Sequence, residues 1–167
     1  WECPDLFPLM VDGQEKWVML LSLGDGGING GSGTMYFVGD FDGESFTNDN
    51  SSETVLWLDY GRDNYAGVSW SDIPEEDGRR LFIGWMSNWD YAQVVPTEKW
   101  RSAMTIPRSL HLIKRSGELM VASRPVAELQ SIHTKAINFG EATIDEESLF
   151  MINMTGDSSV PMILPFR

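Results

Sequence analysis

Short apolar runs, separated by glycine-rich turns, fill most of the chain before residue 125. The runs are rich in β-branched and aromatic residues and are too short for typical helices, so they predict β-strands. Pairs such as Asp12-Gly13, Asp42-Gly43 and Asp77-Gly78 lie between runs, and glycine tolerates the positive φ of hairpin turns. The predicted strands are Trp17–Leu23, Thr34–Phe41, Thr54–Tyr60, Tyr65–Trp70, Arg80–Met86, Ser102–Ile106, Leu110–Lys114 and Leu119–Ala122.

Only one segment predicts a helix. No stretch before residue 125 repeats apolar residues with a helical period, whereas Val126–Ile132 follows Pro125, and proline suits the first turn of a helix. Strand-like runs resume at Ile137–Thr143, Ser148–Asn153 and Val160–Leu164. Strands in groups of about four are typical of propeller blades, although a sandwich has the same periodicity. The chain is therefore predicted to be all-β, with a connector between two β units.

Composition agrees with a folded β protein. Hydrophobic residues make up 42% of the chain, which is ordinary for a globular protein with a core. Phe7, Trp17, Met19 and Leu21 are expected in that core, together with the valines and isoleucines of the strands. The chain also has seven tryptophans, whose rings suit stacking against sugars.

The formal net charge of −13 excludes some partners. A polyanion repels phosphate backbones and acidic membrane surfaces, so we expect neither a nucleic acid nor a membrane as partner. A neutral sugar is compatible with this charge. Cys3 is the only cysteine and the chain has two histidines, which are too few for a zinc site of His and Cys ligands. The sequence therefore predicts no metal and no cofactor.

Glu2 is the first candidate for chemistry. It lies in Trp1-Glu2-Cys3-Pro4-Asp5, and apolar neighbours favour the neutral form of a carboxylic acid, which can then donate a proton to a leaving oxygen. A single glutamate is weak evidence by itself, and a solvated side chain without function is the simpler interpretation from spacing alone.

Two other motifs predict no chemistry. The glycine-rich stretch Gly24–Gly33 lacks the Lys-Ser/Thr ending of a phosphate-binding P-loop and precedes no helix, so a connection between strands is the better interpretation. His111 and His133 have no nucleophile nearby in the sequence, so nothing supports a Ser-His-Asp arrangement.

Further blocks follow Glu2-Cys3-Pro4 along the chain. In their order and approximate spacing they resemble the motifs of glycoside hydrolase family 32, the levanases, exo-inulinases and invertases, and they look most like those of a levanase. The resemblance runs from Glu2 to Arg108 and is faint after residue 135. The blocks are Gly31-Ser32-Gly33, Tyr36–Gly43, Asp59–Ala66, Ile83–Trp89 and Trp100–Arg108.

The resemblance implies a fold and a domain organisation. The family has a five-bladed β-propeller followed by a β-sandwich, with the active site in the propeller's central funnel. By resemblance, residues 1–124 are the C-terminal part of the propeller, about its last three blades. Residues 125–135 are then a linker with a short helix, and residues 136–167 are the first strands of a truncated sandwich. We expect the chain to be a fragment of a longer, secreted protein.

The resemblance also implies retaining hydrolysis that releases fructose from levan, inulin or sucrose. Glu2 is then the general acid/base, and Asp63, Tyr65, Trp85 and Trp89 are candidate substrate-binding residues. The family's Asn-Asp-Pro-Asn-Gly block, which carries the nucleophilic aspartate, does not occur in the sequence, and neither does its Arg-Asp-Pro block. We therefore expect the isolated chain to be inactive.

Other interpretations fit parts of the sequence. A non-catalytic carbohydrate-binding or interaction segment of a propeller fits the missing nucleophile but not the intact Glu-Cys-Pro motif. A related transfructosylase would use the same residues with a different acceptor. Asp63 also fits a turn, and the aromatic candidates also fit a core. Because an incomplete propeller leaves strand edges unpaired, a complementary N-terminal fragment or a homo-oligomer is expected as a partner.

Overall fold

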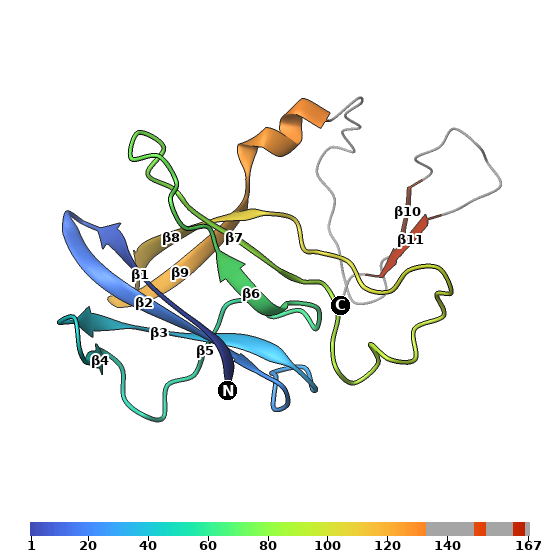
Figure 1. Ribbon diagram of the computed structural model, residues 1–167, viewed down its shortest axis with the longest axis horizontal. Helices are drawn as coiled ribbons and strands as arrows, with labels where there is room; N and C mark the ends of the chain where they lie inside the picture. The colour runs from blue at the N-terminus through green and yellow to red at the C-terminus, as the bar shows by residue number, and fades with distance from the viewer. Residues whose placement is uncertain (133–148, 153–161, 166–167) are drawn as a thin grey trace. The chain divides into compact units, whose positions relative to one another are not determined.

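The computed structural model describes residues 1–132, 149–152 and 162–165 (Figure 1). The chain divides into two units, Trp1–Ser131 and Ile132–Arg167, and all of the sequence blocks introduced above lie in the first unit. The predicted division into 1–124, 125–135 and 136–167 stays a prediction.

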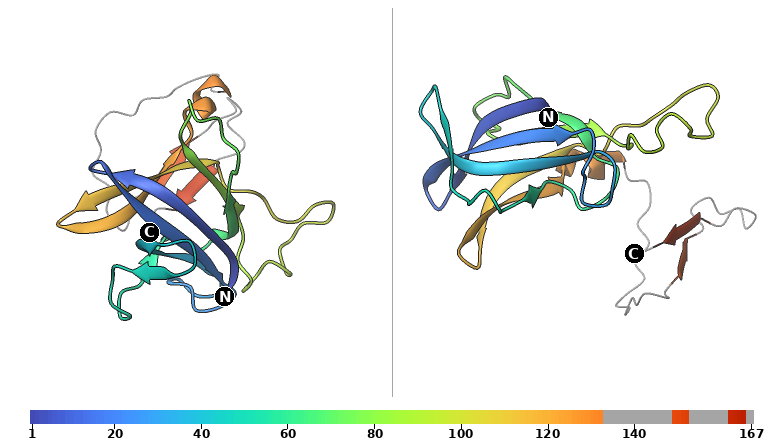
Figure 2. Two further views of the ribbon diagram at one scale, coloured as in Figure 1. Left: turned by 60° about the vertical axis from the view of Figure 1, so that its left-hand side comes forward. Right: turned by 90° about the horizontal axis from the view of Figure 1, so that it is seen from below.

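Two antiparallel sheets form the first unit (Figures 1 and 2). The first sheet has the order β1-β2-β3-β4, with β5 also paired to β3, and the second has the order β6-β7-β8-β9. Each sheet is a meander of consecutive strands, which is the arrangement of a propeller blade, and the all-β class is confirmed. The strands are β1 (Glu2–Val11), β2 (Gln14–Leu23), β3 (Gly33–Phe41), β4 (Phe46–Asn48), β5 (Leu56–Trp57), β6 (Tyr65–Ser69), β7 (Arg80–Trp85), β8 (Arg108–Arg115) and β9 (Glu118–Pro125).

Three further elements follow the second sheet. The predicted short helix is present as the 3-10 helix η1 (Ala127–Ile132). The second unit contains the antiparallel pair β10 (Leu149–Ile152) and β11 (Met162–Pro165), which agrees with two of the late strand predictions. The third, Ile137–Thr143, lies outside the described residues.

Strand β1 was not among the predicted strands. It contains Pro4 and Pro8, and proline within an apolar run argues against a strand because it donates no backbone hydrogen bond. The structure accommodates both prolines because β1 is an edge strand that pairs only with β2. The position of the strand in the sheet, which the local sequence does not reveal, decides the outcome.

Two predicted strands are shorter than expected or absent. Of Thr54–Tyr60, only Leu56–Trp57 pairs, as β5. The prediction of a strand over Ser102–Ile106 is wrong, since a single bridge joins Met104 to Trp85. Ser102 has a φ of 73°, a left-handed conformation that interrupts extended backbone.

The two sheets pack face to face, with β1 lying beside β6 and β8 (Figures 1 and 2). Their shared core includes Phe7 and Leu20 from the first sheet and Phe82 and Leu110 from the second, each at most 1% exposed. Burial of side chains of this size contributes about 1.5–3 kcal/mol each. The predicted burial of Phe7 and Leu21 is confirmed.

Strand β2 has apolar residues on both faces, and the structure buries them to different degrees. Its residues in the core cluster are Val18 and Leu20, whereas Trp17 and Met19 are only partly buried. The core predictions for Trp17 and Met19 are wrong because alternation does not reveal which face is inner when both faces are apolar. The ring of Trp17 packs against Phe41 instead, with 5.1 Å between centroids.

Two hydrogen bonds join β6 to the first sheet, one to β1 and one to β2. The N–H of Ser69 donates to Asp5 Oδ2 at 2.7 Å, and the N–H of Ala66 donates to Ser22 Oγ at 3.1 Å. Ser22 is 1% exposed, so this bond is shielded from water. The relative position of β1 and β6 is therefore set by directional contacts as well as by the core.

Gly67→Ala is expected to destabilise the protein because a Cβ at this position overlaps the ring of Phe82. Phe82 is fully buried and has little room to move, so the cost is about 1–3 kcal/mol. Urea unfolding measures it. Phe82→Leu is expected to cost less in the Gly67→Ala background than alone, and equal costs in the two backgrounds would contradict the overlap. Gly24→Ala is the matched control, since its added Cβ meets only the Tyr65 hydroxyl, at 3.8 Å.

Candidate active site

Two β-bulges lie where β1 and β6 begin. In β1 the pairing moves from Glu2↔Ser22 to Asp5↔Leu20, so one extra residue is inserted after Glu2. In β6 the pairing moves from Tyr65↔Trp85 to Val68↔Ile83, which inserts one residue after Tyr65. Bulges change the direction of side chains and are frequent beside active sites.

Each bulge contains a residue with a left-handed backbone. Cys3 has a φ of 47° and Ala66 a φ of 50°, and residues other than glycine pay for this conformation with about 1–3 kcal/mol. The tertiary hydrogen bond of Ala66 to Ser22 holds one of the two in place. The strain falls directly after Glu2 and Tyr65, so it serves to orient these two side chains.

Glu2 and Tyr65 meet across the two sheets. The hydroxyl of Tyr65 donates a hydrogen bond to Glu2 Oε2. Tyr65 is 3% exposed, whereas Glu2 is exposed. A buried tyrosine therefore fixes a carboxyl group that stays accessible to a ligand, and the predicted general acid and one predicted binding residue are in direct contact.

Trp85 and Trp89 complete this group. The ring of Tyr65 lies 6.1 Å from that of Trp85 and 6.5 Å from that of Trp89, both in edge-on geometry, and the two tryptophans are 4.9 Å apart. Trp89 is 49% exposed. The structure thus brings Glu2, Tyr65, Trp85 and Trp89 together as a carboxyl group beside an aromatic surface. We call these four residues the acid–aromatic cluster.

Asp63 is the remaining candidate for substrate binding. It precedes β6 and is exposed, and within the described residues no hydrogen bond connects it to the cluster. Partial burial raises the pKa of Asp63, and the charge of Arg62 offsets this only in part. Its assignment to substrate binding stays a prediction.

Asn88 has a role that the sequence analysis missed. It is completely buried, and its Nδ2 donates to the carbonyl oxygens of Gly30, Ser32 and Arg62 at 3.0–3.1 Å. Its Oδ1 accepts from the N–H groups of Ser32 and Asp90, at 3.2 and 3.0 Å. One amide therefore joins the glycine-rich loop, the segment before β6 and the segment that carries Trp85 and Trp89. Its place inside the Ile83–Trp89 block was the available signal.

The glycine-rich loop closes around this amide. Gly31 has a φ of 63°, and a Cβ there would overlap Asn88 Oδ1. Gly27 approaches the carbonyl of Ser32 so closely that an added Cβ would lie 2.8 Å from it. Gly27 and Gly31 are therefore needed because the backbone of the loop approaches its neighbours closely. This packing accounts for two glycines of the loop, and phosphate binding is not needed to explain them.

Asp59 holds the segment that leads into Tyr65. Its carboxylate accepts from the N–H of Gly61 at 2.7 Å, from Arg108 at 2.7 Å and from Asn64 at 3.3 Å. Burial alone would raise the pKa of Asp59, but these hydrogen bonds and the charge of Arg108 outweigh it and hold the pKa below its ordinary value. Asn64 precedes Tyr65 directly, so the ion pair supports the acid–aromatic cluster.

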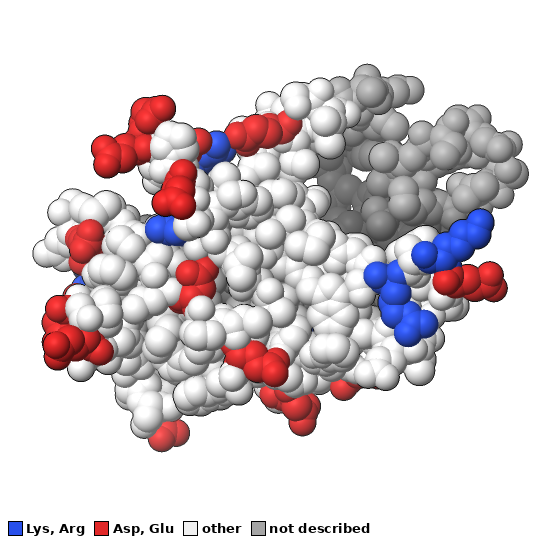
Figure 3. Space-filling view, viewed as in Figure 1, with Lys and Arg blue, Asp and Glu red and all other residues white. Residues whose placement is uncertain are grey.

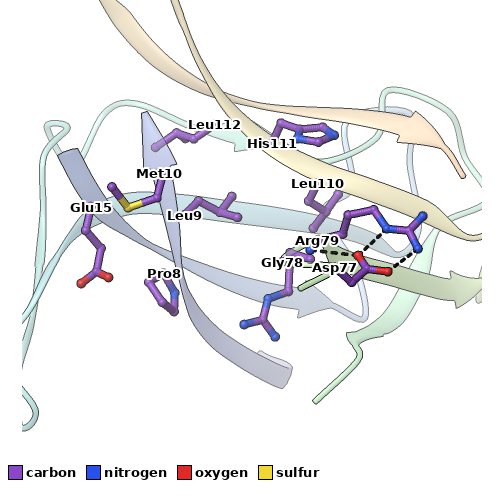
Figure 4. Close-up of a pocket in the computed structure, with 11 residues that line it drawn as sticks. Pro8, Leu9, Met10, Glu15, Asp77, Gly78, Arg79, Leu110, His111 and Leu112 are labelled. Carbon is purple, nitrogen blue, oxygen red and sulfur yellow. Dashed lines mark hydrogen bonds and ion pairs between the residues drawn. The ribbon is translucent and has the colours of Figure 1, made fainter. Parts of the chain in front are cut away.

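A cavity lies between the two sheets, at the end of β1 that is opposite to Glu2 (Figure 4). It measures about 470 Å³, and its lining includes Leu9, Met10, Arg79 and Leu112. Arg79 is already paired with Asp77 and with Glu128 of η1. Because Met10 is at the end of β1 opposite to Glu2, this cavity is separate from the acid–aromatic cluster.

Charged side chains and long helices were the remaining features that could indicate a further site. Acidic side chains are scattered over the face seen in Figure 3. In the part of the chain that the structure describes, no three His, Cys, Asp or Glu side chains form a group that could hold a metal ion. No helix in that part is long and apolar enough to cross a membrane.

Known proteins now place the chain in a family. The model of the glycosyl hydrolases family 32 N-terminal domain matches residues 1–123, and a levanase of Bacillus subtilis (strain 168) is 56% identical over 151 residues. The chain belongs to glycoside hydrolase family 32. An extracellular exo-inulinase of Aspergillus niger is 42% identical to this family 32 chain over 144 residues. These matches cover 89% and 81% of the chain, but only 22% and 26% of the two relatives.

Solved structures agree with the family assignment. An exo-inulinase from Aspergillus awamori has a TM-score of 0.73 and 34% identity, covering 91% of this family 32 chain and 29% of that protein. A β-fructofuranosidase from Schwanniomyces occidentalis, complexed with fructosyl-erythritol, has a TM-score of 0.76 and 31% identity, covering 92% and 30%. The predicted fold class, an all-β chain that forms part of a propeller, is confirmed. The number of blades stays a prediction.

Asn88→Ala is expected to lower the free energy of unfolding by about 3 kcal/mol or more, since each buried polar group left unpaired costs about 1–3 kcal/mol. Chemical denaturation measures this loss. Tryptophan fluorescence should change as well, because Trp85 and Trp89 lose their fixed separation. Asn50→Ala is the control, as the Asn50 side chain makes no comparable set of bonds. A loss below about 1 kcal/mol would show that Asn88 does not hold the loops.

Asp59→Asn is expected to destabilise the protein by about 1–2 kcal/mol near neutral pH, because the charge-assisted bonds weaken. The pKa of Asp59 is lowered in the folded state, so its stabilising effect is complete above its ordinary pKa of 3.8 and is lost as the pH falls through the folded value. The two proteins should therefore differ most near neutral pH, and the difference in the free energy of unfolding should shrink as the pH falls below 3.8. Asp12→Asn, in an exposed turn, is the control, and a pH-independent difference would refute this account.

Proposed function

We propose that this chain supplies the general acid/base part of a retaining glycosidase that releases fructose from β-fructans or from sucrose. The observation that carries the proposal is the hydrogen bond from buried Tyr65 to the exposed carboxyl group of Glu2, beside Trp85 and Trp89. This arrangement offers a positioned acid and an apolar surface for the CH groups of a sugar.

In this mechanism, protonated Glu2 donates its proton to the glycosidic oxygen as the bond to the anomeric carbon breaks. An aspartate carboxylate attacks that carbon and forms a fructosyl–enzyme ester. Glu2, now a carboxylate, takes a proton from water, and the resulting hydroxide cleaves the ester and restores both groups. Such carboxyl pairs lie about 5–5.5 Å apart in retaining enzymes.

The nucleophile is not assigned to any residue of this chain. No Asn-Asp-Pro sequence occurs, and Arg62-Asp63-Asn64 lacks the proline of the family's Arg-Asp-Pro block. The aspartate is therefore proposed to come from a part of the protein outside these 167 residues, and the isolated chain is proposed to be inactive. A complementary N-terminal fragment, if added, should restore the missing group.

The relatives guide the choice of substrate. The relatives named levanase and exo-inulinase support levan and inulin as candidate substrates. The β-fructofuranosidase supports recognition of a fructosyl unit, which levan, inulin and sucrose all contain. We propose Trp85 and Trp89 as the surface for that unit, and Asp63 as a contact to its hydroxyl groups at the rim. The relatives named extracellular support secretion of the whole protein.

A sugar-binding segment without catalysis is the second candidate. The absence of an Asn-Asp-Pro sequence from the chain favours it, and the exposed aromatic surface of Trp89 would serve binding as well as catalysis. The two candidates differ in whether the whole protein turns over its substrate, and, if it does, Glu2 is expected to be required.

Glu2→Gln in the whole protein is expected to reduce fructose release from levan, inulin and sucrose at least about a hundredfold, because a positioned acid/base contributes 10²–10⁴-fold. Release is measured by a fructose assay, with the oligosaccharides formed by transfer analysed in parallel. Glu15→Gln is the matched control, since Glu15 is also an exposed glutamate but pairs with Met10 at the far end of β1.

Each outcome decides between the candidates. Full activity of Glu2→Gln would refute its catalytic role. An inactive unmodified protein that still binds fructans would favour the sugar-binding segment. Oligosaccharides in place of free fructose would identify a transfructosylase.

A further inference from the structure

A small pocket lies on the segment that follows Trp85. It measures about 230 Å³ and is walled by residues of the loop between β7 and β8, the yellow-green loop in Figure 1. None of its lining residues is charged. Tyr91 and Trp100 are aromatic, whereas Ser87, Thr97 and Ser102 carry aliphatic hydroxyl groups. The other lining residues are Met86, Val95 and Ala103.

Tyr91 forms an anchored wall of this pocket. Arg62 lies over its ring, 5.5 Å from the centroid, and Arg62 also pairs with Asp90 at 2.5 Å. The N–H of Tyr91 donates to the carbonyl of Asn88 at 3.2 Å. The guanidinium of Arg62 therefore covers one face of the ring, and the backbone bond holds the turn that carries Tyr91.

Trp100 supplies the accessible part of the wall. It is 67% exposed, although it is the largest side chain of the pocket. An exposed tryptophan beside a fixed tyrosine presents two apolar ring faces to solvent. Sugars bind such faces through their CH groups while their hydroxyl groups face polar atoms.

Thr97 gives the pocket an unsatisfied polar group. Its Oγ1 is shielded from solvent and has no hydrogen-bond partner within the described residues. An unpaired buried hydroxyl costs free energy. A ligand hydroxyl that formed a hydrogen bond with Oγ1 would remove that cost.

The structure assigns this pocket as a second sugar subsite, which binds one ring of a fructan chain away from the ring being cleaved. The ligand is neutral, since no lining residue is charged, and small, since 230 Å³ is below the roughly 300–1,000 Å³ of pockets for drug-sized ligands. Met86 and Ser87, which line the pocket, directly follow Trp85 of the acid–aromatic cluster in the sequence. The inference rests on the proposed function and adds a preference for long fructans over sucrose.

The test measures kcat/KM of the whole protein on inulin, levan and sucrose. Trp100→Ala is expected to lower kcat/KM about tenfold on the two polymers, the loss expected for an aromatic contact, and less than about twofold on sucrose. Trp70→Ala is the matched control, because Trp70 is also a partly exposed tryptophan but does not line this pocket. Equal losses on sucrose and polymers, or none on either, would overturn the subsite.

Thr97→Val gives a second test, in which stability and activity on the polymers are expected to change in opposite directions. Removing an unpaired buried hydroxyl should leave the thermal unfolding temperature equal or higher, while kcat/KM on the polymers falls and that on sucrose does not. A lower unfolding temperature, or unchanged polymer kinetics, would contradict the role of this hydroxyl.

Binding to the Glu2→Gln protein separates this inference from the proposed function. Titration with inulin is followed by calorimetry, with fructose as the single-ring comparison. Weaker inulin binding after Trp100→Ala supports the subsite even if the unmodified protein shows no turnover, a result that would sink only the enzymatic proposal. Unchanged inulin binding overturns the subsite and leaves the enzymatic proposal intact.

Discussion

The buried amide of Asn88 is the contact on which the candidate site depends. It pairs with the glycine-rich loop, with the segment before β6 and with the start of the loop after β7. These segments are far apart in the sequence and lack regular pairing of their own. A single group that satisfies them all makes their positions interdependent, so the separation of Trp89 from Tyr65 depends on a side chain that is itself completely buried.

The two sheets determine where Glu2 and Tyr65 lie. Each begins with a bulge, and the two bulged residues that precede the left-handed positions are Glu2 and Tyr65. Regular alternation would leave both side chains perpendicular to their own sheets. The bulges turn them toward each other, and the Ser22–Ala66 bond fixes the two bulges in space. The strained backbone at the two bulges thus accompanies the contact between Glu2 and Tyr65, which are 63 positions apart in the sequence.

Much of this could be predicted from the sequence, and the failures have identifiable causes. Turn residues and β-branched runs gave most of the strands, because these signals are local. β1 escaped prediction because Pro4 and Pro8 are tolerated only at a sheet edge, and edge position is a tertiary property. Asn88 escaped because hydrogen-bond partners 26 to 58 residues away leave no local pattern. The grouping of Glu2 with Tyr65 and the tryptophans came from motif resemblance, since spacing alone does not bring them together.

The acid–aromatic cluster is formed entirely within the first unit. The partner of Glu2, the bulge beside it and the core beneath it all come from the two sheets of that unit. In the proposed mechanism, the second carboxylate lies outside this chain, so the proposed carboxyl pair is divided between two parts of a protein. Glu2 and Trp89 are both exposed and are therefore open to a group that approaches from outside the chain. Because buried contacts already hold the cluster, the proposal needs the second carboxylate to be brought into place but does not need the cluster to be rebuilt.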